Sequence, residues 1–145
     1  MDYKLFLDAD VILDVVLQRE GFFQNSYPLF KMAEEQDVLL HTSSSVIMNV
    51  QYLSAKFIGK NKAVEGIKYL LDFLEILDCN KKILQKAYNT KCRDIEDAVQ
   101  YFTAIHSGII TFFISRNIKD YKEIEEKFLP VLLPSQFLKL LKQNS

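Results

Sequence analysis

The sequence predicts an α/β fold in which a mostly parallel central sheet is covered by helices on both faces. Three observations predict it. Several short runs are continuously apolar, as strands buried on both faces are. These runs alternate with longer segments whose apolar residues recur at helical spacing, which is typical of parallel sheets built from strand-helix-strand units. The length of 145 residues, with 49% hydrophobic and 26% charged side chains, fits a single domain spanning residues 1–145.

The first half of the chain predicts a strand-helix-strand unit followed by two helices. Asp10 is placed to cap the first helix, and Asn25 or Ser26 can cap the second. The Thr-Ser-Ser-Ser run at 42–45 offers caps for the third helix, which Gly59 ends. The expected elements are a strand at 3–7, helices at 11–17 and 25–35, a strand at 38–41, and helices at 46–57 and 62–73.

The second half continues the alternation. Asn80 is placed to cap a lysine-rich helix, and the acidic run 94–97 opens another helix that Gly108 closes. The segment 109–114 is the most strand-like run in the chain, and a polar loop follows it. The expected elements are a strand at 75–78, helices at 80–88 and 94–108, a strand at 109–114, a loop at 115–120, a strand at 131–133 and a helix at 137–142.

Several classes of site and of protein are excluded. Cys79 and Cys92 stand apart, without a His or second Cys at ligand spacing, so a zinc site and a CxxC redox pair are not expected. His41 and His106 lie in no arrangement that resembles a nucleophilic triad. With only four glycines, the chain has no glycine-rich phosphate loop. No run is long enough to span a membrane and no signal peptide is visible, so we expect a cytoplasmic protein without a membrane partner.

The net charge of −1 conceals an asymmetry along the chain. Residues 1–40 carry three basic and eight acidic side chains, whereas residues 41–93 carry nine basic and four acidic ones. The basic middle, which includes Lys56, Lys60 and Lys62, favours a polyanionic partner such as RNA. The alternative is that these lysines only solvate helix faces.

Acidic side chains follow the strands that should lie at the centre of the sheet. Asp8 and Asp10 come after the first strand, the run 94–97 opens a helix, and Asp120 lies in the loop after 109–114. Ligands of open α/β sheets bind beyond the carboxyl ends of the strands, where these acids should meet. Carboxylates drawn together repel one another unless a cation neutralises them, and oxygen ligands suit Mg²⁺ or Mn²⁺. Asp97 as an ordinary first-turn acid and Asp120 as a solvated loop acid remain alternatives.

Three segments resemble the PIN-domain ribonucleases. They are residues 5–14 (LFLDADVILD), 94–101 (DIEDAVQY) and 114–121 (ISRNIKDY), and the agreement extends to 133–138 (LPSQFL). The resemblance implies a three-layer α/β/α fold with a PIN-like arrangement and metal-dependent hydrolysis of RNA phosphodiester bonds. It also implies the toxin of a bacterial toxin-antitoxin pair, similar to the VapC-like group, with RNA and a cognate antitoxin as partners.

The same resemblance implies roles for individual residues. The catalytic set would be Asp8, Asp97, Asn117 and Asp120, and the Mg²⁺ or Mn²⁺ ligands would be Asp8, Asp10, Asp97 and Asp120. Asn49 and Ser115 would support these ligands. Apart from the resemblance, the basic middle of the chain and the planar guanidinium of Arg116 predict RNA binding by Arg116, Lys56, Lys60 and Lys62. One departure concerns Asn49, which stands where the family usually has a Glu. An amide oxygen can coordinate a metal but adds no negative charge, so weaker metal binding is expected.

Two other functions stay open. Asn49 is compatible with a PIN-like module that binds RNA or protein without cutting RNA. The Asp8-Ala9-Asp10 spacing is compatible with a haloacid-dehalogenase-like phosphatase, in which Asp8 would be the nucleophile and Asp10 the acid-base. The apolar helices at 46–57 and 62–74 offer a surface for an antitoxin or for a homodimer.

Overall fold

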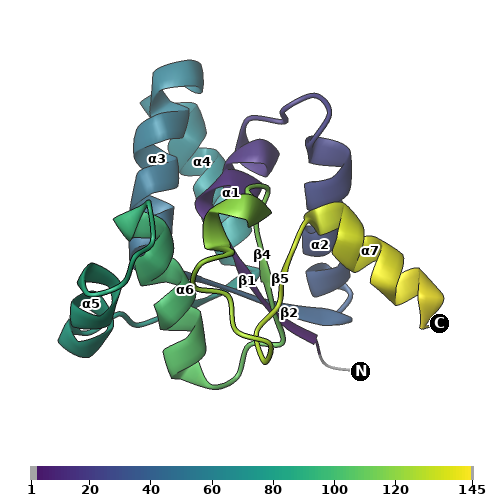
Figure 1. The fold of residues 1–145 in the computed structure, drawn as a ribbon. Coiled ribbons are helices and arrows are strands. Elements are labelled where there is room, and N and C mark those ends of the chain that lie inside the picture. Colours follow the sequence, from purple (N-terminus) through teal and green to yellow (C-terminus); the bar gives the residue numbers. More distant parts are fainter. Residues whose placement is uncertain (1–2, 145) are drawn as a thin grey trace.

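Five parallel strands form the central sheet of the computed structural model, which describes residues 3–144 (Figure 1). The strands lie in the order β3-β2-β1-β4-β5, and each neighbouring pair is parallel. Their bounds are Tyr3–Leu7 (β1), Val38–Ser43 (β2), Leu74–Leu77 (β3), Phe112–Ile114 (β4) and Val131–Leu132 (β5). The predicted parallel sheet is therefore confirmed.

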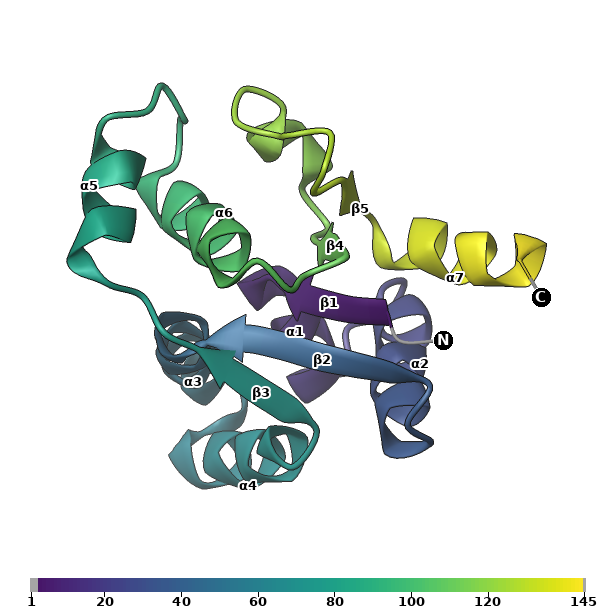
Figure 2. The same cartoon turned by 90° about the horizontal axis from the view of Figure 1, so that it is seen from below.

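Helices cover both faces of this sheet, which confirms the three-layer α/β/α arrangement (Figure 2). One face carries α1 to α4 and α7, and the other carries α5, α6 and a short 3₁₀ helix, η1. The bounds are Ala9–Val16 (α1), Phe23–Glu34 (α2), Ser44–Ile58 (α3), Lys60–Leu71 (α4), Lys81–Tyr88 (α5), Ile95–Ser107 (α6), Ile118–Tyr121 (η1) and Pro134–Gln143 (α7).

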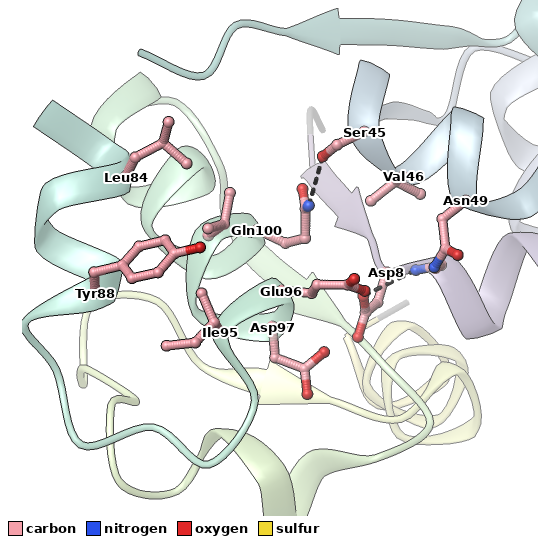
Figure 3. A pocket seen from close by; sticks show the side chains of 12 residues that line it. Asp8, Ser45, Val46, Asn49, Leu84, Tyr88, Ile95, Glu96, Asp97 and Gln100 are labelled. Atoms are coloured by element: carbon pink, nitrogen blue, oxygen red, sulfur yellow. Dashed lines mark hydrogen bonds between the residues drawn. The ribbon is translucent and has the colours of Figure 1, made fainter. Parts of the chain in front are cut away.

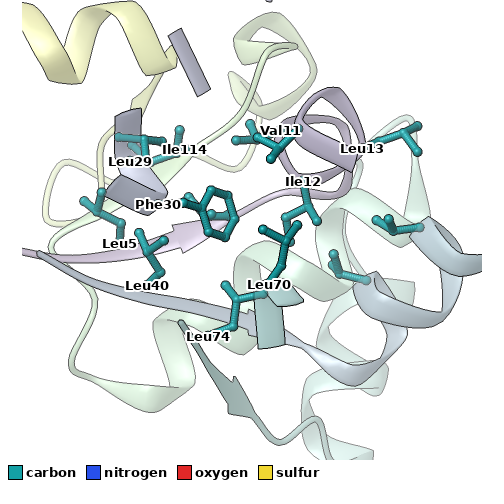
Figure 4. Packing of buried hydrophobic residues seen from close by; sticks show 14 of the residues in the cluster. Leu5, Val11, Ile12, Leu13, Leu29, Phe30, Leu40, Leu70, Leu74 and Ile114 are labelled. Carbon is teal, nitrogen blue, oxygen red and sulfur yellow. The ribbon is translucent and has the colours of Figure 1, made fainter. Parts of the chain in front are cut away.

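The alternation of side chains along β1 divides the core into two clusters. Leu5 and Leu7 face the cluster that includes α1 to α4, whereas Phe6, between them, faces α5 and α6. Figure 4 shows the first cluster, in which Leu29 and Phe30 of α2 pack above the strands. Because β1 is buried on both sides, its carboxyl end is fixed firmly, and the residue that follows it is fixed with it.

Some expected element boundaries were wrong. Asp8, and not Asp10, caps the first helix, because Asp8 keeps the extended backbone of β1 and its side chain accepts a hydrogen bond from the Ala9 N–H. The strand expected at 109–114 is shorter, since residues 112–114 alone pair with β1 after α6 ends at Gly108 with φ +71°. The polar loop expected at 115–120 contains η1.

The carboxyl ends of β1 and β4 meet where the strand order reverses. From β1 the chain proceeds to β2 and β3 on one side, and it later returns to place β4 and β5 on the other. The Asp8 N–H donates to the Ile114 carbonyl at 2.9 Å, so the residues following both strands begin side by side. In open α/β sheets this position is the usual place for a ligand. In the part of the chain that the structure describes, no helix has the length and apolar character needed to cross a membrane.

Candidate functional site

A pocket of about 300 Å³ opens at the carboxyl end of the sheet, between the start of α1 and helices α3, α5 and α6. Figure 3 shows carboxylates gathered on one side of it and apolar side chains of α5 on the other. The lining residues most relevant to chemistry are Asp8, Asn49, Leu84, Tyr88, Glu96 and Asp97. The pocket thus joins an acidic side to an apolar side.

Asp8 is the most buried acid of the pocket, with 6% of its surface exposed. Its Oδ1 accepts a hydrogen bond from the Ala9 N–H at 2.9 Å. Its Oδ2 accepts two more, from the Ser115 hydroxyl at 2.9 Å and the Tyr121 hydroxyl at 2.5 Å. Burial raises the pKa of Asp8 and the charge of Asp94 adds to the rise, whereas the three hydrogen bonds oppose it. The carboxylate is oriented by its donors, and within residues 3–144 it forms no ion pair.

Asp97 enters the same pocket from the first turn of α6. The Asp94 side chain caps this helix by accepting hydrogen bonds from the N–H groups of Glu96 and Asp97. Burial raises the pKa of Asp97 to about 7, and the negative charges of Asp8, Asp94 and Asp120 contribute to the rise. A cation bound between Asp8 and Asp97 would remove this repulsion.

Asp10 lies beside Asp8 but does not line the pocket. Its Oδ2 accepts hydrogen bonds from the Arg116 N–H at 3.1 Å, the Asn117 side-chain amide at 3.1 Å and the Ser115 hydroxyl at 3.5 Å. Its buried Oδ1 has no hydrogen-bond partner among residues 3–144. Burial and the charge of Asp8 raise the pKa of Asp10 to about 7. Asp10 and Ser115 therefore connect Asp8 to the loop after β4.

The structure brings together fewer acids than the sequence suggested. Asp120 is exposed and does not line the pocket, and exposed Asn117 bonds to Asp10 instead. Within residues 3–144 there is no group of three or more Asp, Glu, His or Cys side chains that could hold a metal ion, so the expected cluster of four acids is not found. Asp8 and Asp97 remain as a pair. Two carboxylates fit Mg²⁺ or Mn²⁺ that keeps several water ligands and takes others from a substrate phosphate.

The wall between α3 and α6 is built from a network that the sequence did not reveal. Buried Gln100 accepts a hydrogen bond from the Ser43 hydroxyl at 2.5 Å and donates one to the Ser45 hydroxyl at 2.7 Å. Ser43 also caps α3 by accepting from the Val46 N–H. Asn49 lies about one turn further along α3 and lines the pocket beside this network. The amide is thus present where the resemblance implied a carboxylate.

Arg116, predicted to contact RNA phosphate, is engaged by a buried acid. Its guanidinium makes two hydrogen bonds to Asp14, which is 1% exposed, and lies 4.0 Å from the centre of the Phe22 ring. Burial raises the pKa of Asp14, and the charges of Arg116 and Arg19 oppose the rise. Arg116 therefore holds the loop after β4 against α1, and it does not line the acidic pocket.

The three lysines predicted to bind RNA lie around the junction of α3 and α4. Lys56 is in the last turn of α3, Lys60 begins α4, and Gly59 between them has φ +86°. Lys56, Lys60 and Lys62 are exposed and none of them lines the pocket. Their contact with RNA stays a prediction.

Two residues of the site were not expected from the sequence. Tyr121 reaches Asp8, although an aromatic residue after a polar loop is typical of core packing. Tyr88, with 70% of its surface exposed, forms part of the apolar side of the pocket. Tyr121 stands within the segment 114–121, and no pattern in the sequence marked its hydroxyl.

Comparison of this sequence with known proteins shows the family to which the chain belongs. A sequence model described as the PIN domain matches residues 4–119. The chain belongs to the PIN-domain family. This PIN domain is also similar to a curated relative, Ribonuclease VapC1 of Aquifex aeolicus (strain VF5), with 32% identity over 110 residues that cover 72% of this chain and 76% of the relative.

Solved structures share the fold of this PIN domain at low identity. VapBC2 from Rickettsia felis, bound to a DNA fragment from its promoter, aligns with a TM-score of 0.67 and 19% identity, covering 90% of this chain and 98% of the other. Mycobacterium tuberculosis VapC20, a sarcin-ricin loop cleaving toxin, aligns at 0.59 and 13%, covering 75% and 86%. PAE2754 from Pyrobaculum aerophilum aligns at 0.62 and 14%, covering 99% of each chain.

The family and the positions of Asp8 and Asp10 both argue against the haloacid-dehalogenase-like phosphatase. It required Asp8 and Asp10 to face one substrate. In this PIN domain Asp8 lines the pocket, whereas Asp10 accepts hydrogen bonds from Ser115, Arg116 and Asn117 in the loop after β4.

Proposed function

We propose that this PIN domain is a metal-dependent endoribonuclease that hydrolyses RNA phosphodiester bonds. The observation that carries the proposal is the meeting of Asp8 and Asp97 in one pocket at the carboxyl end of the sheet. Burial raises the pKa of both acids, and the charge of Asp8 adds to the rise at Asp97, so a divalent cation held by the two carboxylates would relieve this cost. The relative named as a ribonuclease supports the same reaction.

Asp8 and Asp97 are the side chains that would hold Mg²⁺ or Mn²⁺, with the Asn49 amide as a further oxygen donor at the pocket wall. When bound, such an ion activates water and stabilises negative charge on a phosphate. The chain itself contributes orientation: Ser115 and Tyr121 fix Asp8, and Asp94 fixes the start of α6 that carries Asp97. Asn117, whose side-chain amide donates to Asp10 of α1, and Asp120 lie in the segment after β4 that borders this site.

The substrate fits the two sides of the pocket. A nucleotide has a flat apolar base and a charged phosphate, and the pocket offers Leu84 and Tyr88 opposite its metal-binding acids. Exposed aromatic rings bind unpaired bases by stacking. Lys56, Lys60 and Lys62 would attract the RNA backbone at the end of α3 that follows Asn49.

We further propose that the protein is the toxin of a toxin-antitoxin pair and that an antitoxin is its protein partner. The similarity to VapBC2 and VapC20 supports this assignment. An apolar surface suited to a partner lies on α3, where Met48, Tyr52 and Phe57 are each more than half exposed. A homodimer would compete for the same apolar side chains.

Cleavage of RNA by the purified protein tests the proposed reaction. We expect RNA cleavage with Mg²⁺ or Mn²⁺, loss of cleavage on chelation, and at least a roughly hundredfold lower rate for Asp8→Asn and Asp97→Asn. Asp37→Asn is the matched control, because Asp37 is exposed and precedes β2 at the opposite edge of the sheet. Cleavage that survives Asp8→Asn unchanged would show that another site, or a contaminant, is responsible.

A second function is favoured by Asn49, which brings no negative charge to the pocket wall. With Asn49 in its wall and no three-acid group among the described residues, the domain is also suited to retain RNA without cutting it. This function predicts salt-sensitive RNA binding and no cleavage product at saturating Mn²⁺. Product analysis across a Mn²⁺ titration separates the two functions.

A further inference from the structure

The ring of Tyr121 packs in the core, and its hydroxyl reaches the site. It is 0% exposed, and its ring lies 4.9 Å from that of Phe113 and 6.0 Å from that of Tyr101, measured between centroids. Its hydroxyl donates to Asp8 Oδ2 at 2.5 Å. The ring is thereby held by packing, which gives the hydroxyl a fixed position against the carboxylate.

The hydrogen bonds on Asp8 distinguish its two oxygens. A carboxylate oxygen has about two acceptor directions, and Oδ2 uses them for Tyr121 and Ser115. Within residues 3–144, Oδ1 accepts a single hydrogen bond, from the Ala9 N–H. Oδ1 is therefore the oxygen that retains an acceptor direction for a cation.

Tyr101 shows that this core has another way to satisfy a buried tyrosine. The Tyr101 hydroxyl donates to the Leu129 carbonyl at 2.6 Å and accepts from the Glu126 N–H at 2.9 Å, so it serves the backbone alone. A buried hydroxyl needs a partner in either case. Tyr121 differs because its hydroxyl faces the acids of the site: it donates to Asp8 at the carboxyl end of β1, and its hydrogen bond to Asp97 opposes the rise in the pKa of that acid.

We propose that Tyr121 is a positioning residue for Asp8, which it holds together with Ser115 so that Asp8 binds a divalent cation through Oδ1. The proposal rests on the proposed function only in taking Asp8 as a metal ligand. Groups that hydrogen-bond to metal ligands orient them, and removing such a group typically weakens metal binding about 10- to 100-fold.

The test compares Y121F with Y101F, which removes a hydroxyl from the same core without touching Asp8. Mn²⁺ binding is measured without RNA, by electron paramagnetic resonance of free Mn²⁺, and folding is followed by circular dichroism. We expect Y121F to raise the Kd for Mn²⁺ about tenfold or more. Y101F should lower thermal stability and leave the Kd unchanged. S115A, which removes the other donor to Oδ2, should also raise the Kd, and keeps the test valid if Y121F does not fold.

The outcomes separate this inference from the proposed reaction. The inference is overturned if the Kd for Mn²⁺ is unchanged in Y121F, or in S115A where Y121F does not fold. It is also overturned if Y101F raises this Kd as much as Y121F does. If the wild-type protein binds no Mn²⁺, the inference fails together with the metal site. If Y121F weakens Mn²⁺ binding while no variant cleaves RNA, the role of Tyr121 stands and the nuclease reaction falls. In a cleaving protein, Y121F should need more Mn²⁺ for the half-maximal rate and recover kcat at saturation.

Discussion

The Arg116 guanidinium binds the buried Asp14 carboxylate through two hydrogen bonds, from Nε to Oδ2 at 2.9 Å and from Nη2 to Oδ1 at 3.2 Å. The pair joins α1 to the loop after β4, and neither residue lines the pocket. Because the next residue, Asn117, bonds to Asp10, the pair also fixes the backbone that surrounds Asp10.

Removing Arg116 should destabilise the fold. In R116A the Asp14 carboxylate keeps, among residues 3–144, the ion pair with Arg19, whose Nη1 lies 3.5 Å away. Breaking a buried ion pair on one side should cost roughly 3 kcal/mol of the free energy of unfolding. R19A is the matched control and should cost less than about 1 kcal/mol, since Arg19 is more exposed. Urea unfolding measures both; equal losses would mean that the two-bond geometry is unimportant.

The raised pKa of Asp97 predicts how stability depends on pH. Its value is about 7 in the folded protein, against an unfolded value of about 3.9. Between these values the folded state binds more protons, so the free energy of unfolding of the metal-free protein should fall as pH rises from about 4 to about 7.

The D97N variant isolates this effect. Without the charge, the metal-free variant should melt a few degrees above the wild type at about pH 8, and the difference should vanish near pH 4. Saturating Mn²⁺ should raise the Tm of the wild type more than that of D97N. D37N, at an exposed acid that does not line the pocket, is the control. A D97N protein that melts below the wild type at high pH would contradict the raised pKa of Asp97.

Asn49→Glu should strengthen metal binding. The substitution adds a carboxylate to the pocket wall that faces Asp8 and Asp97. We expect a Kd for Mn²⁺ at least several-fold lower and, without metal, a lower Tm at about pH 8, since the added charge repels the acids already there. Asn49→Gln has the same length without the charge and should show neither change. Isothermal titration calorimetry decides; equal affinity in N49E and N49Q would place residue 49 outside the coordination sphere.

Tyr88→Ala should weaken RNA binding if bases stack at the apolar side of the pocket. Stacking on one aromatic ring is worth about 1–3 kcal/mol, so the Kd for single-stranded RNA should rise several-fold or more. Because Tyr88 is 70% exposed, the fold should be unaffected. Tyr88→Phe keeps the ring and should bind as the parent does. Fluorescence anisotropy in an Asp8→Asn background avoids cleavage; equal binding by the Ala variant would exclude stacking there.

Neutralising the lysines around the α3–α4 junction should reduce the salt dependence of RNA binding. Each lost phosphate contact lowers the slope of log Kd against log salt by about 0.7 for single strands. The variant carries Lys56→Gln, Lys60→Gln and Lys62→Gln, and Lys139→Gln on α7 is the control. If the triple variant has the same slope of log Kd against log salt as the wild type, these lysines do not contact RNA phosphates.

Much of the fold could be predicted from the sequence because its signals are local. Continuous apolar runs such as 3–7 predict buried strands, and capping side chains such as Asn80 and Asp94 mark helix starts that the structure confirms. The start of α1 was misplaced because Asp8 and Asp10 are both good caps. Choosing between them depends on where β1 stops pairing with β4, which is a contact between distant segments.

The site was harder to predict for the same reason. Asp8 and Asp97 follow from the carboxyl-end rule for parallel sheets, but the direction of a side chain does not. The orientation of Asp10 toward Asn117 and the exposure of Asp120 both depend on the path of the chain after β4. The pairing of Arg116 with Asp14 was one of two alternatives that the sequence left open, and the structure decides for it. The hydrogen bond from the Tyr121 hydroxyl to Asp8 depends on η1, a helix that no local sequence pattern predicted.

Asp8 follows β1, caps α1 and lines the pocket, so one carboxylate serves both architecture and chemistry. A substitution of Asp8 therefore has two effects: it removes the cap that stabilises the start of α1, and it removes a proposed metal ligand. Inactivity of an Asp8 variant therefore needs a folding measurement beside it, whereas Asp97, whose helix is capped by Asp94, offers a cleaner separation of the two effects. For engineering an inert but intact scaffold, position 97 is the better choice.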